Sequence, residues 1–226
     1  MGGGIVHHIN YIKYMLYTKK GDNGTTKTFG CDQRISKSSN IAEALGSLDE
    51  INSFLGLCKV QSAYLKFQLG DRNLSEIVHD IQKNLFIIQA EIGGADKNIE
   101  AVKVKELEEI VDEIEKALPP IKHFFISGGP ADITSWQQSG AGLGAIFDIA
   151  RTIARRAERR VIAVAEEISQ PSLLTDGSEE NTALNTKKII NKHTLAYLNR
   201  LSSALYALAR YSNHKVGIME EAPDYR

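Results

Sequence analysis

Five arginines lie within ten residues, from position 151 to position 160. The apolar residues around them recur every three or four positions, which predicts a helix. On a helix, Arg151, Arg155 and Arg159 share one face, where like-charged neighbours cost about 0.2–0.5 kcal/mol per pair. A polyphosphate would offset that repulsion, because the planar guanidinium group matches phosphate oxygens. The pattern is consistent with an anion site, and equally with a stripe that is solvated or faces another subunit.

The other two arginines of this stretch, Arg156 and Arg160, project away from that face, and we expect them to be solvated. Glu158 follows Arg155 by three positions, so an i,i+3 ion pair could neutralise part of the stripe. An anion site on this helix would therefore rest mainly on Arg155 and Arg159.

A second basic cluster, residues 18–27, contains three lysines, three threonines and two glycines. Glycine lets backbone N–H groups approach an anion, and lysine and threonine side chains can complete the cradle. The spacing is not that of a Walker A loop, and no strand–loop–helix pattern follows it. Taken by itself, the cluster is more simply explained as a solvated turn.

Several single residues also carry chemical interest. Asp49 is either a helix-edge carboxylate or the partner of an arginine, within the bundle or across a subunit boundary. Asn199 lies beside an apolar seam, where it could set helix register or reach a ligand. Phe125 precedes a glycine pair and is either a core residue or a wall for a flat ligand. Glu76 and His79 match half of a di-iron motif, but the second half is absent, so we expect no side-chain metal site.

Composition limits the classes of function. The chain has 226 residues and a net charge of −1, which disfavours non-specific nucleic-acid binding. Its two cysteines, Cys31 and Cys58, are far apart, which favours a reduced, cytoplasmic protein. No apolar run approaches the roughly 20 residues that span a bilayer. Residues 1–14 lack the features of a signal peptide, and we expect a disordered extension there.

Apolar residues at helical spacing predict the elements that must position these side chains. We expect helices over about 39–65, 74–95, 104–118, 145–168 and 187–213. The glycine-rich residues 127–130 and 139–144 and the polar residues 169–185 indicate loops. Short extended pieces are expected near 16–18 and 124–126. The fold class is therefore all-α, a single five-helix bundle over residues 15–226.

Together these features resemble the PduO-type ATP:cob(I)alamin adenosyltransferases. The similar segments follow the family's order from Thr18 to Arg210. They are TKKGDNGT (18–25), EALGSLDE (43–50), QKNLF (82–86), AE (90–91), FISGG (125–129), ARTIARRAERR (150–160) and YLNRLS (197–202).

The resemblance implies a homotrimer of five-helix bundles, with active sites between subunits and an extended N-terminal loop that binds ATP. The ATP-binding residues that it implies are Thr18, Lys19, Lys20, Gly21, Thr26, Lys27, Lys37, Arg155, Arg156, Ala157, Glu158, Arg159 and Asn199. It implies an inter-subunit ion pair between Asp49 and Arg151, and it places Phe125 against the lower face of the corrin.

The reaction implied by the resemblance is attack of cob(I)alamin on the ribose C5′ of ATP, which yields adenosylcobalamin and triphosphate. Arg155, Arg159 and Phe125 would be its catalytic residues. Magnesium would bind to the phosphates, and the product could be handed to an adenosylcobalamin-dependent enzyme. Two alternatives stay open: a non-catalytic carrier or sensor of ATP or corrinoid, and a helical assembly protein.

The chain departs from the family pattern on the side expected to bind the corrin. Ser127 replaces the usual proline before the glycine pair, and Asp148 replaces the usual histidine. An insertion over about 132–142, with Trp136, lengthens the loop that follows Phe125.

Overall fold

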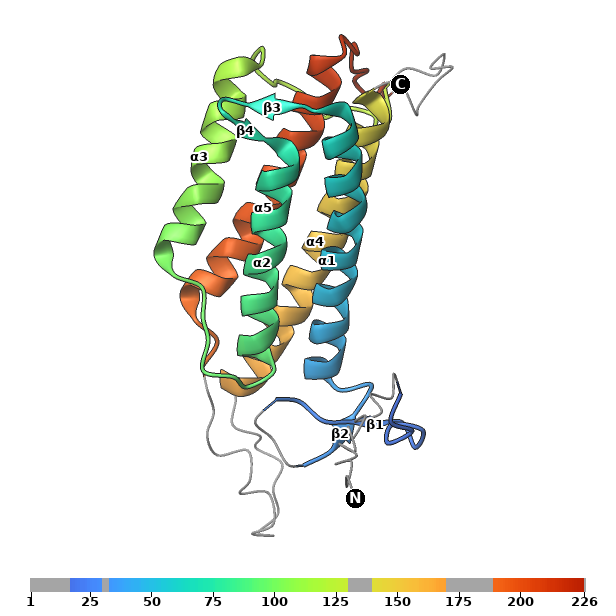
Figure 1. Ribbon diagram of the computed structural model, residues 1–226, viewed down its shortest axis with the longest axis vertical. Helices are drawn as coiled ribbons and strands as arrows, with labels where there is room; N and C mark the ends of the chain where they lie inside the picture. The colour runs from blue at the N-terminus through green and yellow to red at the C-terminus, as the bar shows by residue number, and fades with distance from the viewer. Residues whose placement is uncertain (1–16, 30–32, 130–139, 170–188, 226) are drawn as a thin grey trace, which may run out of the picture.

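The computed structural model describes residues 17–29, 33–129, 140–169 and 189–225. Five helices run alternately up and down the long axis of the molecule (Figure 1), which confirms the all-α bundle. They are α1 (Asn40–Leu65), α2 (Leu74–Ile92), α3 (Ala101–Ala117), α4 (Gly140–Ser169) and α5 (Lys192–Lys215). The predicted extension 1–14, and most of the predicted insertion with Trp136, lie outside the described residues.

Four two-residue strands accompany the helices. β1 (Thr25–Thr26) pairs antiparallel with β2 (Ile35–Ser36) before α1, and β3 (Gln68–Leu69) pairs with β4 (Arg72–Asn73) between α1 and α2. The expected extended piece at 124–126 forms no strand. No helix in the described part of the chain is long and apolar enough to cross a membrane.

Local chemistry explains where the first two helices begin. The Ser39 hydroxyl accepts a hydrogen bond from the backbone N–H of Ala42 and caps α1. The Glu76 carboxylate accepts one from the N–H of Asn73 at 3.1 Å, as in a capping box. Glu76 therefore caps the start of α2. This role explains the presence of one of the two residues of the apparent di-iron motif.

The largest departure from the predicted elements is the start of α4. Residues 139–144 were expected to form a loop because glycine costs about 1 kcal/mol in a helix interior. Instead, α4 begins at Gly140, and Leu143 is fully buried. A Cβ atom on Gly144 would lie only 2.1 Å from Oδ1 of Asn213, on α5. Glycine is needed there because the two helices approach closely, and their packing outweighs its poor helix propensity.

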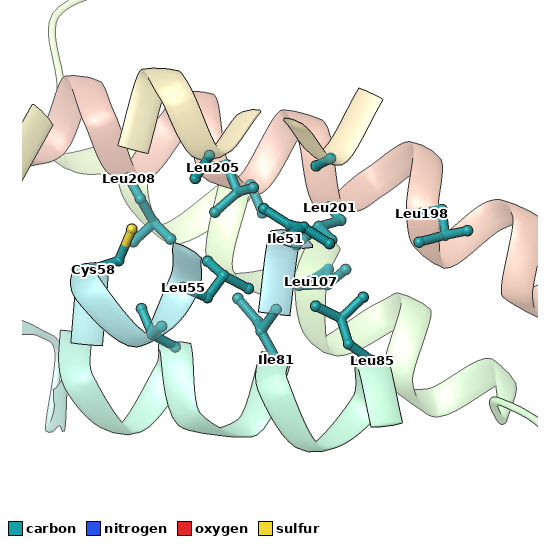
Figure 2. Close-up of a cluster of buried hydrophobic side chains, with 14 of the residues drawn as sticks. Ile51, Leu55, Cys58, Ile81, Leu85, Leu107, Leu198, Leu201, Leu205 and Leu208 are labelled. Atoms are coloured by element: carbon teal, nitrogen blue, oxygen red, sulfur yellow. The ribbon is translucent and has the colours of Figure 1, made fainter. Parts of the chain in front are cut away.

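All five helices contribute large apolar side chains to the core, and α4 adds buried alanines to its own, which include Phe147. Figure 2 shows leucine and isoleucine side chains of α1, α2, α3 and α5 in mutual contact, including Ile51, Leu85 and Leu205. On α4, Ala154 and Ala157 are completely buried. These alanines let α4 lie close between α1 and α5, and they fix which face of α4 its arginines must occupy.

Polar contacts inside the bundle tie α2 to α5. The buried Glu91 carboxylate accepts hydrogen bonds from the backbone N–H of Asn191, at 2.7 Å, and from the Thr194 hydroxyl. The Asn84 side chain donates to the Tyr197 hydroxyl at 3.2 Å. Each hydrogen bond satisfies a polar group that would otherwise be buried without a partner. These contacts therefore favour one register between α2 and α5.

Candidate functional site

Arg155 and Arg159 lie exposed on α4, and neither forms an ion pair with another described residue. Their charge is therefore not neutralised by the described part of the chain. The i,i+3 pair predicted between Arg155 and Glu158 is not formed. Anion binding by this face of α4 stays a prediction, and the lack of an ion pair within the described residues is compatible with it.

Glu158 is held by α5 instead. The Asn199 side-chain amide donates a hydrogen bond of 3.0 Å to the Glu158 carboxylate, and its Oδ1 accepts one of 2.8 Å from the Arg200 guanidinium. Arg200 in turn pairs with Glu108 of α3 at 2.9 Å. Two predicted site residues, Glu158 and Asn199, are thus brought together beside the arginine face.

The expectation that Arg156 and Arg160 are only solvated is wrong. Arg156 pairs with Glu50, and Arg160 lies 3.8 Å from Glu43, both on α1. Packing of α4 against α1 turns this side of the helix toward those glutamates. All four side chains are about half exposed, so each pair is worth only about 0.2–1 kcal/mol. Arg156 is thus already partnered within the chain.

Arg151 and Asp49, the predicted inter-subunit pair, are not in contact within the chain. Arg151 is partly buried, with Nε 3.7 Å from an Asp148 oxygen and its guanidinium 6.0 Å from the Tyr206 ring centre. Asp49 is exposed on α1. A pair between two subunits therefore stays a prediction.

The N-terminal loop is organised by Arg34, which the sequence reasoning missed. Its guanidinium donates to the backbone carbonyls of Lys20 and Thr25 and to the Thr25 hydroxyl. Gly21 lies against Lys37, since a Cβ there would sit 3.0 Å from Nζ of Lys37. The one available signal was that Arg34 is the only arginine before Arg72.

Two residues of this loop adopt left-handed backbone conformations. Lys19 has φ of 59° and Gly24 has φ of 77°. A lysine in this region costs of order 1–3 kcal/mol, and such strain tends to gather at functional sites. Of the other predicted loop residues, Thr18 precedes this turn, Thr26 lies in β1 and Lys27 follows β1, with Thr18 and Lys27 exposed.

A cavity of about 420 Å³ lies between α3, α4, α5 and the segment 118–127. Phe125 and Arg155, two of the predicted catalytic residues, both line it, together with Ser127, Arg151 and Tyr206. A larger hollow of about 650 Å³, between α1 and α2, contains His79 but none of the predicted ATP or corrin residues. The smaller cavity is therefore the better candidate site.

A buried charge cluster lies beneath the Phe125 side of this cavity. Arg210 of α5, only 2% exposed, pairs with Asp148 and has Nε 3.0 Å from a Glu220 oxygen. That Nε–H is not aligned for a hydrogen bond. Burial raises the pKa of the Glu220 carboxyl above its usual value, against the opposing effects of Asn213 and Arg210. Sequence reasoning did not single out Arg210 or Glu220.

Figure 1 shows β1 and β2 at one end of the bundle and the chain that leaves the C-terminal end of α3 at the other. Asp148 lines the cavity, whereas Asn40, which follows the loop, contacts Glu167 at 2.9 Å. Positions 148 and 167 are 19 residues apart on α4, or about 28 Å along the helix axis. A single chain therefore does not bring its loop to its own Phe125.

Comparison with known proteins identifies the class. The family model for cobalamin adenosyltransferase matches residues 16–212. The chain therefore belongs to this family, which agrees with the resemblance seen in its motifs.

Two relatives are similar to most of this chain. The corrinoid adenosyltransferase of Bacillus subtilis (strain 168) is 33% identical over 207 residues, with 90% of this chain and 89% of the relative covered. Corrinoid adenosyltransferase PduO of Salmonella typhimurium is 32% identical over 216 residues. The alignment covers 91% of this chain but 53% of that protein, so the chain spans about half the length of this PduO relative.

A solved structure supports the same assignment. A variant of the PduO-type ATP:corrinoid adenosyltransferase from Lactobacillus reuteri, complexed with cobalamin and ATP, matches with a TM-score of 0.70. The two chains are 25% identical, over 93% of this chain and 97% of the other.

Proposed function

We propose that this protein transfers the 5′-deoxyadenosyl group of ATP to cob(I)alamin and releases triphosphate. The observation that carries the proposal is that Phe125 and Arg155 line one cavity, while Arg155 and Arg159 have no ion-pair partner in the described chain. An apolar wall for a flat ring and an anion-binding face thus lie side by side, as this pair of substrates requires.

In the proposed reaction, Co(I) donates an electron pair to C5′ of the ribose and a Co–C bond forms. The C5′–O bond breaks at the same time, and its electron pair leaves with the triphosphate. Because cobalt is the nucleophile, no side-chain nucleophile or general base is needed. The protein acts by positioning the substrates and by stabilising charge.

The basic residues would stabilise the negative charge that develops on the leaving triphosphate. We expect Arg155 and Arg159, on α4, and Lys19 and Lys27, on the N-terminal loop, to take this role. Glu158, held by Asn199, would limit the positive charge of the arginine face. Ala157 is completely buried, so its methyl group serves the packing of α4.

Magnesium would bind to the phosphate oxygens of ATP and share this role. In the described part of the chain, no group of three or more His, Cys, Asp or Glu side chains is placed to hold a metal ion. Phosphate oxygens are hard ligands that suit magnesium, so the proposal needs no protein ligand.

Phe125 would cover the lower face of the corrin and exclude water and any lower axial ligand from cobalt. A four-coordinate Co(II) centre is easier to reduce to Co(I) than a five-coordinate one. The ring is half-buried at the edge of the cavity, so one of its faces is available to a substrate.

We further propose a homotrimer whose active sites combine the loop of one subunit with the cavity of its neighbour. The separation of about 28 Å along α4 supports this arrangement, because it places the loop of a chain far from the Phe125 end of its own cavity. Asp49 and Arg151 would meet at the same boundary. We expect a cytoplasmic protein that hands adenosylcobalamin to an enzyme requiring it.

The test is to incubate the protein with ATP, magnesium and chemically reduced cobalamin and to follow the visible spectrum of adenosylcobalamin. We expect ATP-dependent formation of the Co–C bond and release of triphosphate. Binding of both ligands without that bond would instead identify a carrier or sensor. Absence of an ATP-dependent thermal shift would identify a helical assembly protein.

A further inference from the structure

Phe125 lies in a segment with no regular structure of its own. Between α3 and the glycine pair, residues 118–129 form neither helix nor strand in the described chain. Phe124, its neighbour, is 79% exposed. The position of the Phe125 ring must therefore be set by contacts with other elements.

The contact beneath the ring is a buried cation. The Arg210 guanidinium lies 5.7 Å from the Phe125 ring centre and 4.9 Å from the Tyr206 ring centre. Both rings line the candidate cavity. A cation at this distance is attracted to an aromatic face, and the attraction is stronger when the cation is shielded from water, as Arg210 is.

Two carboxylates fix this cation in place. Asp148 approaches it from α4, and Glu220 approaches it from the segment that follows α5. A second cation, Arg151, lies 3.7 Å from Asp148, so the cluster contains two positive and two negative charges. The two carboxylates compensate the buried charge, which would otherwise be costly.

The segment after α5 also holds the Phe125 segment directly. The Glu220 carboxylate accepts a hydrogen bond of 2.6 Å from the Asn213 amide. The backbone carbonyl of the next residue, Glu221, accepts one of 2.8 Å from the N–H of Ile126, which follows Phe125. One short stretch of chain thus reaches both the buried cation and the residue beside the ring.

We propose that Arg210 is a positioning residue that seats Phe125 in the cavity, and that Glu220 holds the C-terminal segment against the segment that carries Phe125. This inference rests on the proposed function for its role in catalysis. It adds that residues which need not touch either substrate determine how well Phe125 covers the lower face of the corrin.

Glu220→Gln is the mildest test, because it removes the charge and keeps the shape of the side chain. Glu221→Gln is the matched control: its side chain is exposed, and its carbonyl is retained. Arg210→Lys is a second variant. It keeps the positive charge but loses the planar guanidinium group, which contacts both Asp148 and Glu220.

The first measurement is hydrogen–deuterium exchange of the Ile126 amide in the protein without substrates. We expect exchange at least about tenfold faster in Glu220→Gln and Arg210→Lys, and unchanged exchange in Glu221→Gln. The second is the fraction of bound cob(II)alamin that is four-coordinate by EPR. We expect that fraction and kcat to fall several-fold, with KM for ATP within about twofold of wild type.

A wild-type exchange rate at Ile126 in Glu220→Gln would overturn the inference, and so would an unchanged four-coordinate fraction. If the wild-type protein itself makes no adenosylcobalamin, the proposed function fails. In that case the hydrogen-exchange rates at Ile126 still test whether these contacts hold the Phe125 segment, because they do not depend on activity.

Discussion

Asn199 of α5 donates a hydrogen bond of 3.0 Å to Glu158 of α4, within one turn of Arg155. This contact keeps a carboxylate away from the arginine that would meet the triphosphate. The strength of the proposed ATP site therefore depends on a polar contact between two helices as well as on the arginines themselves.

Asn199→Ala should weaken ATP binding because it frees Glu158 to pair with Arg155. The loss of one hydrogen bond is worth about 0.5–1.5 kcal/mol, so we expect Kd for ATP to rise by roughly 2- to 12-fold. Isothermal titration calorimetry measures this directly. In the double variant with Glu158→Gln the effect should largely disappear, and its persistence would contradict this role for Glu158.

Arg155→Ala should lower kcat by hundreds-fold without unfolding the bundle. Removing one donor that stabilises developing charge costs about 2.7–4 kcal/mol of barrier. Arg160→Ala is the control, since that residue pairs with the half-exposed Glu43 and should change kcat little. Near-normal turnover of Arg155→Ala in a steady-state assay would rule out its assignment.

Phe125→Ala should still bind cob(II)alamin but lose the four-coordinate species. Without the apolar wall, water or an axial base can reach cobalt. Visible and EPR spectra of the bound corrinoid measure this. Spectra identical to those of the wild-type complex would mean that the ring does not cover the corrin.

Gly144→Ala should destabilise the fold by about 1–3 kcal/mol, because the new methyl group would overlap the buried Asn213 side chain. Gly46→Ala, in the middle of α1, meets no atom within 4 Å and should stabilise by about 0.5–1 kcal/mol. Urea denaturation of both variants measures the two changes in the free energy of unfolding, which should have opposite signs. Equal effects would mean that the contact between α4 and α5 does not require glycine.

Glu220 should make stability depend on pH in an unusual direction for a carboxyl group. Because its pKa is raised in the folded protein, the folded state binds its proton more tightly than the unfolded state. Its stabilising effect is present below the ordinary value of 4.5 and is lost as pH rises through the folded pKa.

Glu220→Gln loses the ionic contact with Arg210, but the stability that it loses relative to wild type should become smaller as pH rises above 4.5. The charged groups that face Glu220 are Arg210 and Asp148. Thermal unfolding from pH 4 to pH 8 measures the difference. A constant difference between the two proteins would show that Glu220 does not titrate differently in the two states.

The periodicity of apolar residues was sufficient to predict five helices and their order, because each helix buries one face and local spacing records that face. The same spacing predicted the exposed face that carries Arg155 and Arg159. The ordered set of motifs between Thr18 and Arg210 was also sufficient to indicate the family.

Contacts between distant segments could not be predicted in this way. Glycine at position 144 argued locally for a loop, yet close packing against Asn213 makes it the right residue for a helix. Arg210 follows the alanines and leucines of α5 and gives no local sign that it is buried against Asp148 and Glu220. Its role depends on how α4, α5 and the C-terminal segment come together in the folded structure. The reason is that the free energy of a buried charge is set by the groups that surround it in space.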